Sequence, residues 1–482
     1  MKPIKMLALS AAALSAYGLF ASVANDAMTN DPQVVMKALS VNQRYPWNGK
    51  VDIDFTFTNA YPEAFAFINF RAEYVDRSGA TVEVPMKTFE QVTLPWCTNS
   101  GTYHVTWDAA ADAPNLTVTN LRYTVTANMA KYMVVDLSKG QNGPFPISYY
   151  EDVPSFPGVE AGKWDDYHKT TNLVLRLIQP GTYKQAWSDS TSVDTKREGY
   201  AHTATLTKPF YMAVFELTQE QCYLMTGSYG DSRGFTGGRY QMRPTMITYQ
   251  NMRGKGYNGT INFPATGSDV AATSVLYGFR QNTGSNGFDL PTETEWEYAC
   301  RSGGLASGFW NDGSDAGIST STKFSTISNG VGSAVALDTL GRYQHNGGMV
   351  KTWDEETQTY IYTAAPASSD ESLGTAVVGS YRPNAWGLYD MHGNVDEWTN
   401  GAWNNPQTPL YSSTAETVDD LGFWQKSWGQ YSYRITRGGA YNHSARFCLI
   451  PRRKREGGMI TERSSVGVRL VWRFPTPPQL TE

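Results

Sequence analysis

Polar and apolar residues alternate along much of the chain between residues 34 and 137, and this pattern restricts the region to extended structure. Turn pairs such as Asn48-Gly49 separate segments that are rich in β-branched and aromatic residues. The segments are VDIDFTFT (51–58), AFINFRAEYV (66–75), TVEVPM (81–86), YHVTW (103–107) and LRYTVTA (121–127). Their number and spacing predict an all-β sandwich of immunoglobulin-like size over residues 30–139. No catalytic constellation stands out there, so we expect a spacer or a binding module.

The composition changes after this region. Residues 140–170 are rich in proline, glycine and acidic residues, and we interpret them as a linker between domains. A second domain is expected over residues 171–474. Two capping boxes, Thr218–Gln221 and Thr292–Glu295, predict short helices in it, and a third helix is expected from Asp269 to Arg280.

The N-terminus has the pattern of an export signal over residues 1–24. Lys2 and Lys5 precede an apolar segment, which ends in the small-x-small cleavage pattern Ser22-Val23-Ala24. A membrane anchor is the alternative interpretation, but no other segment has the roughly 20 apolar residues that span a bilayer. We therefore expect an extracytoplasmic protein, periplasmic or secreted, that is not an integral membrane protein.

Charge and cysteine content exclude several classes of protein. The net charge of −5 argues against nucleic acid as a partner. The four cysteines form no CxxC pair, so neither a disulfide scaffold nor a zinc or redox motif is predicted. The six histidines show no zinc-site spacing.

Five sequence blocks follow one another in the second domain. They are TLTKPFYMAVFELTQEQCYLMTG (205–227), FDLPTETEWEYACRSGG (288–304), VGSYRPNAWGLYDMHGNVDEW (378–398), RITRGGAYNHSARFCLIPRRK (434–454) and SSVGVRLVW (464–472). In this order they resemble the formylglycine-generating-enzyme, or sulfatase-modifying factor, family. The resemblance implies an α+β domain of C-type-lectin-like fold, here preceded by the all-β sandwich. It also implies a copper-dependent oxidase that uses dioxygen to convert the cysteine of a CxPxR segment to formylglycine.

The third block carries oxygen-bearing side chains on a tight, glycine-containing turn, YDMHGNVDEW (389–398). Such a cluster suits a hard cation, which takes six to eight oxygen ligands. By resemblance, a family calcium site maps here, with carboxylate ligands from Asp390 and Glu397 and carbonyl ligands from Gly393 and Val395. The family often has an amide at position 390. The alternative is an Asx-turn with a solvated acidic face. We expect calcium as a cofactor.

The fourth block decides the chemistry. Active family members bind copper(I) through two cysteines separated by four residues, because soft thiolate ligands suit that ion. Here the two positions are His443 and Cys448. The resemblance also departs at four neighbouring positions, where the family's serine, histidine, tyrosine and tryptophan are replaced by Ala440, Ser444, Phe447 and Asp396. Three interpretations stay open: the family's oxidase, a His443–Cys448 metal site of another kind, and a packed Cys448 beside an exposed His443.

A basic run, PRRKR (451–455), follows Cys448. Its residues Arg452 and Arg453 would hold an acidic ligand through forked guanidinium contacts, or else form a solvated basic loop. Taken together, the sequence favours a calcium-stabilised binding module that lacks the family's oxidase activity. Its ligand would be a peptide, a glycan or a protein. The alternative function is an active copper-dependent oxidase that generates formylglycine in sulfatases.

Overall fold

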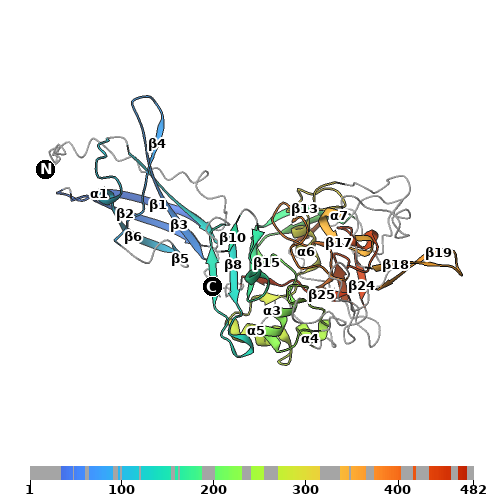
Figure 1. The fold of residues 1–482 in the computed structure, drawn as a ribbon. Coiled ribbons are helices and arrows are strands. Elements are labelled where there is room, and N and C mark those ends of the chain that lie inside the picture. Colours follow the sequence, from blue (N-terminus) through green and yellow to red (C-terminus); the bar gives the residue numbers. More distant parts are fainter. Residues whose placement is uncertain are drawn as a thin grey trace. The chain divides into compact units, whose positions relative to one another are not determined.

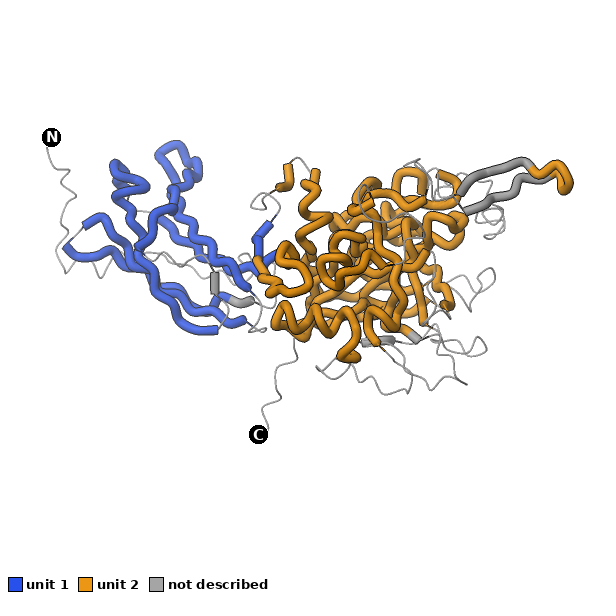
Figure 2. The backbone as a smooth tube through the Cα atoms, turned by 60° about the horizontal axis from the view of Figure 1, so that its bottom comes forward, with its two compact units in different colours: residues 1–131, 149–155, 477–482 blue, residues 132–148, 156–476 orange. Residues whose placement is uncertain are grey.

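The computed structural model divides the chain into two compact units, which Figure 2 distinguishes by colour. Unit 1 comprises residues 1–131, 149–155 and 477–482, and unit 2 comprises residues 132–148 and 156–476. The predicted export signal lies outside the described residues. The described residues are 34–46, 48–59, 65–90, 96–97, 100–118, 121–152, 158–160, 163–186, 201–230, 240–254, 270–314, 337–346, 349–364, 374–402, 416–418, 434–456 and 465–474.

Unit 1 is built from two antiparallel sheets (Figure 1). One has the order β1-β2-β6, with bounds Val34–Gln43, Lys50–Asn59 and Gly101–Asp108. In the other, β3 (Ala66–Val75) pairs with β4 (Thr81–Val84), β5 (Trp96–Cys97) and β7 (Arg122–Met129). The short helix α1 (Ala109–Asp112) follows β6. Every second residue of β2 is buried, because successive side chains of a strand point to opposite faces of its sheet.

The division between the units lies earlier than the sequence pattern indicated. Strand β8 (Tyr132–Asp136) pairs antiparallel with β12 (Asn172–Ile178), so residues that we assigned to the sandwich belong to a sheet of unit 2. Residues 140–148, part of the expected linker, also belong to unit 2. Alternation identifies a strand but does not say which sheet the strand joins, and for this reason the boundary was misplaced.

Unit 2 contains several small sheets around a mixed core. The largest has the order β16-β26-β15-β12-β8-β9. Its strands not yet introduced are β16 (Phe288–Asp289), β26 (Val471–Arg473), β15 (Phe210–Ala213) and β9 (Ile147–Tyr150). A four-stranded sheet contains, in order, β24 (Lys454–Glu456), β23 (Arg434–Arg437), β21 (Asp396–Ala402) and β25 (Val466–Gly467). A three-stranded sheet joins β13, β14 and β22: Gly181–Gln185, His202–Leu206 and Glu416–Val418. The described part of the unit also has three strand pairs. These are β10 (Val159–Glu160) with β11 (Lys163–Trp164), β17 (Gly341–Arg342) with β20 (His392–Gly393), and β18 (Met349–Asp354) with β19 (Thr359–Ala364).

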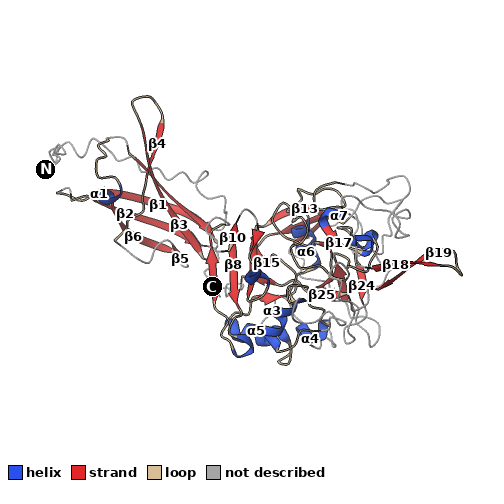
Figure 3. Ribbon diagram, viewed as in Figure 1, coloured by secondary structure: helices blue, strands red, loops and turns tan. Residues whose placement is uncertain are grey.

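The described helices of unit 2 are short (Figure 3). Both predicted capping boxes are present, at the starts of α3 (Gln219–Thr226) and α6 (Glu293–Cys300). Helix α5 (Val275–Thr283) begins later than expected, because Ser274 rather than an earlier residue caps it. The remaining helical segments are α4 (Tyr249–Arg253), α7 (Leu337–Leu340), η1 (Gly140–Asn142), η2 (Asp166–Lys169), η4 (Gln344–Asn346) and η5 (Ala445–Cys448). An α+β unit preceded by an all-β unit confirms the predicted fold class.

Candidate functional site

Helix α6 is held in place by buried ion pairs. The carboxylate of Glu297 lies 2.9 Å from Arg301, and it also accepts a hydrogen bond from Arg437, the arginine of the Arg-Gly-Gly stretch. Both Glu297 and Arg437 are buried. Burial opposes ionisation of Glu297, but the two arginines outweigh it and lower the pKa of Glu297. Through Glu297, helix α6 in the second sequence block is therefore bound to Arg437 in the fourth sequence block.

A second buried pair joins the third block to the fifth. Glu397 on β21 lies 2.7 Å from Arg469, in the segment between β25 and β26. The Glu397 carboxylate also accepts a hydrogen bond from Trp296 Nε1 on α6 at 2.6 Å. Arg469 in turn donates to the carbonyls of Ala213 and Val214, each at 3.0 Å. Every strong donor of this guanidinium thus meets an oxygen, which is the condition for a tolerable buried charge.

Two more carboxylates lie close to this pair. Glu216 accepts hydrogen bonds from Asn394 Nδ2 at 2.7 Å and from the Val395 amide at 3.1 Å. Asp390 accepts one from the Gly379 amide at 2.6 Å, while its Oδ1 is buried and has no hydrogen-bond partner among the described residues. Burial raises the pKa of Asp390 to about 6 and raises the pKa of Glu216 well above its ordinary value.

Glu397, one of the predicted calcium ligands, is already paired with a cationic side chain. Both oxygens of this carboxylate accept hydrogen bonds from Arg469, and one of them also accepts the bond from Trp296. A divalent cation there would compete with a buried guanidinium. The described residues also contain no group of three or more His, Cys, Asp or Glu side chains arranged to hold a metal.

His443 belongs to a polar cluster of three side chains. Lys454 Nζ lies 2.7 Å from Asp396 Oδ2 and 3.3 Å from His443 Nε2. The other ring nitrogen of His443, Nδ1, lies 3.3 Å from the same Asp396 oxygen. Burial lowers the pKa of His443 to about 4, so the imidazole is neutral at physiological pH. Asp396 and His443 are two of the positions where the sequence departs from the family pattern, and here they contact each other.

Cys448 is packed in an apolar cluster. Its neighbours there include Trp310, Leu340 and Leu449, and the residue is fully buried. Its carbonyl accepts a hydrogen bond from His392 Nδ1 at 2.6 Å. Burial raises the pKa of the thiol far above its ordinary value, so the thiolate that copper(I) requires is disfavoured. With an ammonium beside His443 as well, the two positions do not fit a copper site.

The two arginines predicted to bind a ligand face the protein interior. Arg452 is 1% exposed, and its guanidinium lies over the ring of Phe447 at 5.2 Å from the centroid. Arg453 is 7% exposed and lies 2.5 Å from Glu293 at the start of α6. Lys454 was not singled out from the sequence, although it belongs to the same basic run. Its partner Asp396 is distant along the chain. In the sequence, Asp396 stood out only because the family has a tryptophan at that position.

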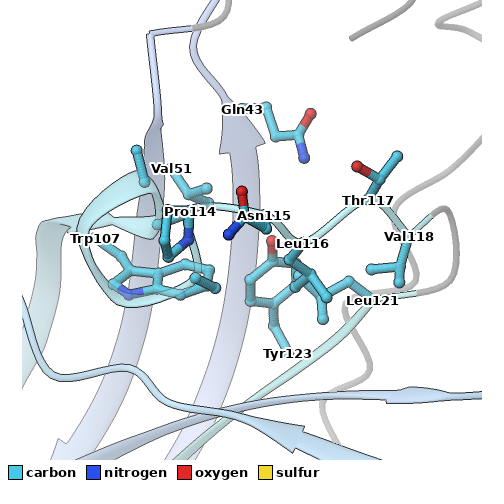
Figure 4. A pocket seen from close by; sticks show the side chains of 13 residues that line it. Gln43, Val51, Trp107, Pro114, Asn115, Leu116, Thr117, Val118, Leu121 and Tyr123 are labelled. Atoms are coloured by element: carbon cyan, nitrogen blue, oxygen red, sulfur yellow. The ribbon is translucent and has the colours of Figure 1, made fainter. Parts of the chain in front are cut away.

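Unit 1 contains a small open pocket of ≈ 120 Å³ at the end of its sandwich. Figure 4 shows Trp107 and Tyr123 at its base and Gln43, Asn115 and Thr117 around it. The Tyr123 hydroxyl is buried and has no hydrogen-bond partner in the described part of the chain, and burial raises its pKa to about 12. None of the predicted site residues lines this pocket. No described helix is long and apolar enough to cross a membrane.

Comparisons with known proteins agree with this architecture. Residues 165–474 match the model of the sulfatase-modifying factor enzyme 1-like domain. The chaperone protein LppX of Paenibacillus barcinonensis is 27% identical over 50% of this chain and 75% of its own length. The formylglycine-generating enzyme of Streptomyces coelicolor is 33% identical over 33% of this chain, and that of Bos taurus is 28% identical over 33%. The alignments cover only 38% and 31% of the lengths of these two enzymes.

Solved structures with a similar backbone include the Treponema denticola variable protein 1, with a TM-score of 0.39 and 21% identity over 63% of this chain and 96% of that one. Another is PvdO from Pseudomonas aeruginosa, with a TM-score of 0.41 and 18% identity over 62% of this chain and 94% of that one. The family model matches well over half of the sequence and contains all five sequence blocks. This chain belongs to the formylglycine-generating-enzyme, or sulfatase-modifying factor, family.

Proposed function

We propose that this protein is a binding module of its family and does not generate formylglycine. The observation that carries the proposal is the contact of Lys454 with Asp396 and His443, at 2.7 and 3.3 Å, at the position of the first copper-binding cysteine. The hydrogen bond from Lys454 engages the lone pair of His443 Nε2 that a metal would need, and the thiol of Cys448 is buried in an apolar cluster. The chain therefore lacks the pair of accessible thiolates on which the family reaction depends.

A protein or peptide is the ligand that we favour. The name of the Paenibacillus barcinonensis relative describes a chaperone, and this relative aligns over a larger share of both chains than the formylglycine-generating enzymes do. We place the interaction outside the cytoplasm, on the basis of Lys2, Lys5 and the apolar segment that follows them. In this proposal unit 2 supplies the binding surface.

A direct test is to incubate the full chain with a CxPxR peptide, a copper salt, a thiol reductant and oxygen. Mass spectrometry then detects replacement of the thiol by an aldehyde. The formylglycine-generating enzyme of Streptomyces coelicolor is the positive control. We expect no conversion, and conversion at a rate that depends on copper would overturn the proposal.

A variant shows whether the missing cysteine alone, or the whole group of changed residues, prevents the copper-dependent reaction. His443→Cys restores the first thiol position but leaves Asp396, Lys454 and Ala440 in place. We expect this variant to remain inactive, because the Lys454–Asp396 pair still lies beside position 443 and Cys448 is still buried. If His443→Cys alone gave turnover, the polar cluster would not be the obstacle that we describe.

A further inference from the structure

The loop that carries His443 contains polar atoms that the rest of the described protein does not satisfy. Asn442 Oδ1, His443 Nδ1 and Arg446 Nε are buried and have no hydrogen-bond partner there. Burial of an unpaired polar atom costs about 1–3 kcal/mol, so each of the three needs an explanation. One explanation for such atoms is a site where a bound water, ion or ligand completes the hydrogen bonds.

The hydrogen bonds of His443 determine which kind of group is unsatisfied. Lys454 Nζ is a donor only, so its contact with Nε2 makes that nitrogen an acceptor. In a neutral imidazole the proton is then on Nδ1. Although Nδ1 lies 3.3 Å from Asp396 Oδ2, it makes no hydrogen bond of acceptable geometry with it. The loop therefore presents unsatisfied donors on His443 and Arg446 beside one unsatisfied acceptor on Asn442.

The charge of this segment favours an anionic ligand. Residues 434–456 contain seven arginines and lysines and a single acidic residue. Arg437 and Arg453 pair with glutamates of α6, and Lys454 pairs with Asp396. Arg446 has no carboxylate partner in the described part of the chain, so its positive charge is not neutralised. The family peptide CxPxR is itself basic, and this surface would repel it.

The site is partly open to solvent. The side chains of His443 and Lys454 are 17% and 23% exposed, and Asn442 and Arg446 are half-buried. A residue in this range can be reached by a ligand while its stem stays packed. Phe447, whose ring lies 5.2 Å from that of His443, provides an apolar neighbour.

We propose that the loop of Asn442, His443 and Arg446, together with Lys454, binds a carboxylate of an acidic peptide segment. Arg446 supplies the unpaired positive charge, His443 donates a hydrogen bond, and the amide of Asn442 meets the peptide backbone. Guanidinium–carboxylate contacts give both strength and orientation to such binding. The inference rests on the proposed function, because it gives a ligand to the site that has lost its oxidase chemistry.

Isothermal titration of the full chain with three peptides tests this inference. The first peptide has aspartate and glutamate side chains and a blocked C-terminus, the second has only a free C-terminal carboxylate, and the third is a neutral Asn/Gln version. We expect one of the acidic probes to bind at least about 10-fold more tightly than the neutral peptide, and to weaken as salt rises. The tighter probe shows whether a side-chain or a terminal carboxylate is recognised. Equal binding of all three, or no binding, would overturn the inference.

Two variants assign the effect to the loop. Arg446→Gln removes the unpaired charge, and Asn442→Asp adds a negative charge with little change in volume, so each should weaken acidic-peptide binding at least about 10-fold. Arg77→Gln, at an exposed turn of unit 1, is the matched control and should bind as the natural chain does. Thermal unfolding confirms that each variant is folded, and wild-type affinity in both loop variants would contradict the assignment. The CxPxR assay on the same samples separates the two proposals. Conversion of the peptide would contradict the proposed function. Absence of both conversion and acidic-peptide binding would contradict only the proposed class of ligand.

Discussion

Buried charged side chains are paired differently in two regions of unit 2. Around α6 and β21, the carboxylates of Glu297 and Glu397 meet arginine guanidinium groups, and all the partners are almost completely buried. Around His443, by contrast, Asp396 meets a lysine that is 23% exposed, and neighbouring polar atoms have no partner among the residues that the structure describes. The first region is made of residues that fit the family pattern and build the scaffold. The second contains the residues that depart from it, so these departures are confined to a small region on a preserved frame.

The largest effect is expected when the frame is broken. Arg469→Met leaves the buried carboxylate of Glu397 without its ion pair, close to Asp390 and Glu216. Loss of one partner of a buried pair costs about 3–5 kcal/mol, because the other charge stays desolvated. Urea unfolding should therefore show a comparable loss in the free energy of unfolding, or the variant should fail to accumulate as folded protein.

The matched control is an exposed pair in the same unit. Arg382 lies 3.1 Å from Asp312 with its side chain 58% exposed, so Arg382→Met should change the free energy of unfolding by no more than about 1 kcal/mol. If Arg469→Met were equally mild, the pair with Glu397 would not be part of the frame.

A smaller effect, of opposite sign, is expected at Asp390. Its folded-state pKa of about 6 lies above the ordinary value of 3.8, so the folded protein holds this proton more tightly than the unfolded chain does. Stability is then lost as pH rises from about 4 to about 6, and the loss persists at higher pH. Asp390→Asn removes this titration and should raise the free energy of unfolding by up to about 3 kcal/mol at pH 8, and by no more than about 1 kcal/mol at pH 4.5.

Backbone geometry permits this substitution. Asp390 has a φ of 56°, a conformation in which asparagine is among the best tolerated residues, and the family often has an amide at this position. Asp166→Asn, at an exposed position, should show no comparable change between the two pH values. A gain that is the same at both pH values would mean that packing, and not the proton, explains the result.

Local signals predicted more of the fold than of the site. Strand β3 has the bounds expected from its alternation, and both capping boxes form, because each depends on neighbouring residues alone. The membership of β8 in the sheet of unit 2 depends on a pairing with β12 that alternation does not encode. The cluster at His443 joins Lys454 to an aspartate 58 positions away, and no spacing rule indicates such a contact.

At the His443 region, the expected effect is a shift in titration and not a loss of fold. Burial is the main cause of the low pKa of His443, Asp396 raises it, and Lys454 lowers it further. Lys454→Met removes the repelling ammonium and leaves Asp396 in place, so the pKa of His443 should rise above about 4. NMR titration of the ring resonances measures this directly. Lys131→Met, at an exposed position of unit 1, should leave the titration unchanged, and a fall in the pKa would contradict the proposed geometry.

The smallest effect is expected from calcium. Its addition tests whether the region around Glu397 needs a metal ion in addition to its arginine. A ligand at about 100 times its Kd stabilises a folded protein by about 2.7 kcal/mol, which shifts the Tm of a large domain by several degrees. If Asp390 and Glu397 held calcium, addition of millimolar calcium after EDTA treatment should therefore raise the Tm clearly. We expect a change of less than about 1 °C, because Arg469 already supplies the cation that Glu397 needs, at 2.7 Å. A larger rise that Asp390→Asn abolishes would show that the frame, like the family sites it resembles, requires a metal as well as its arginine.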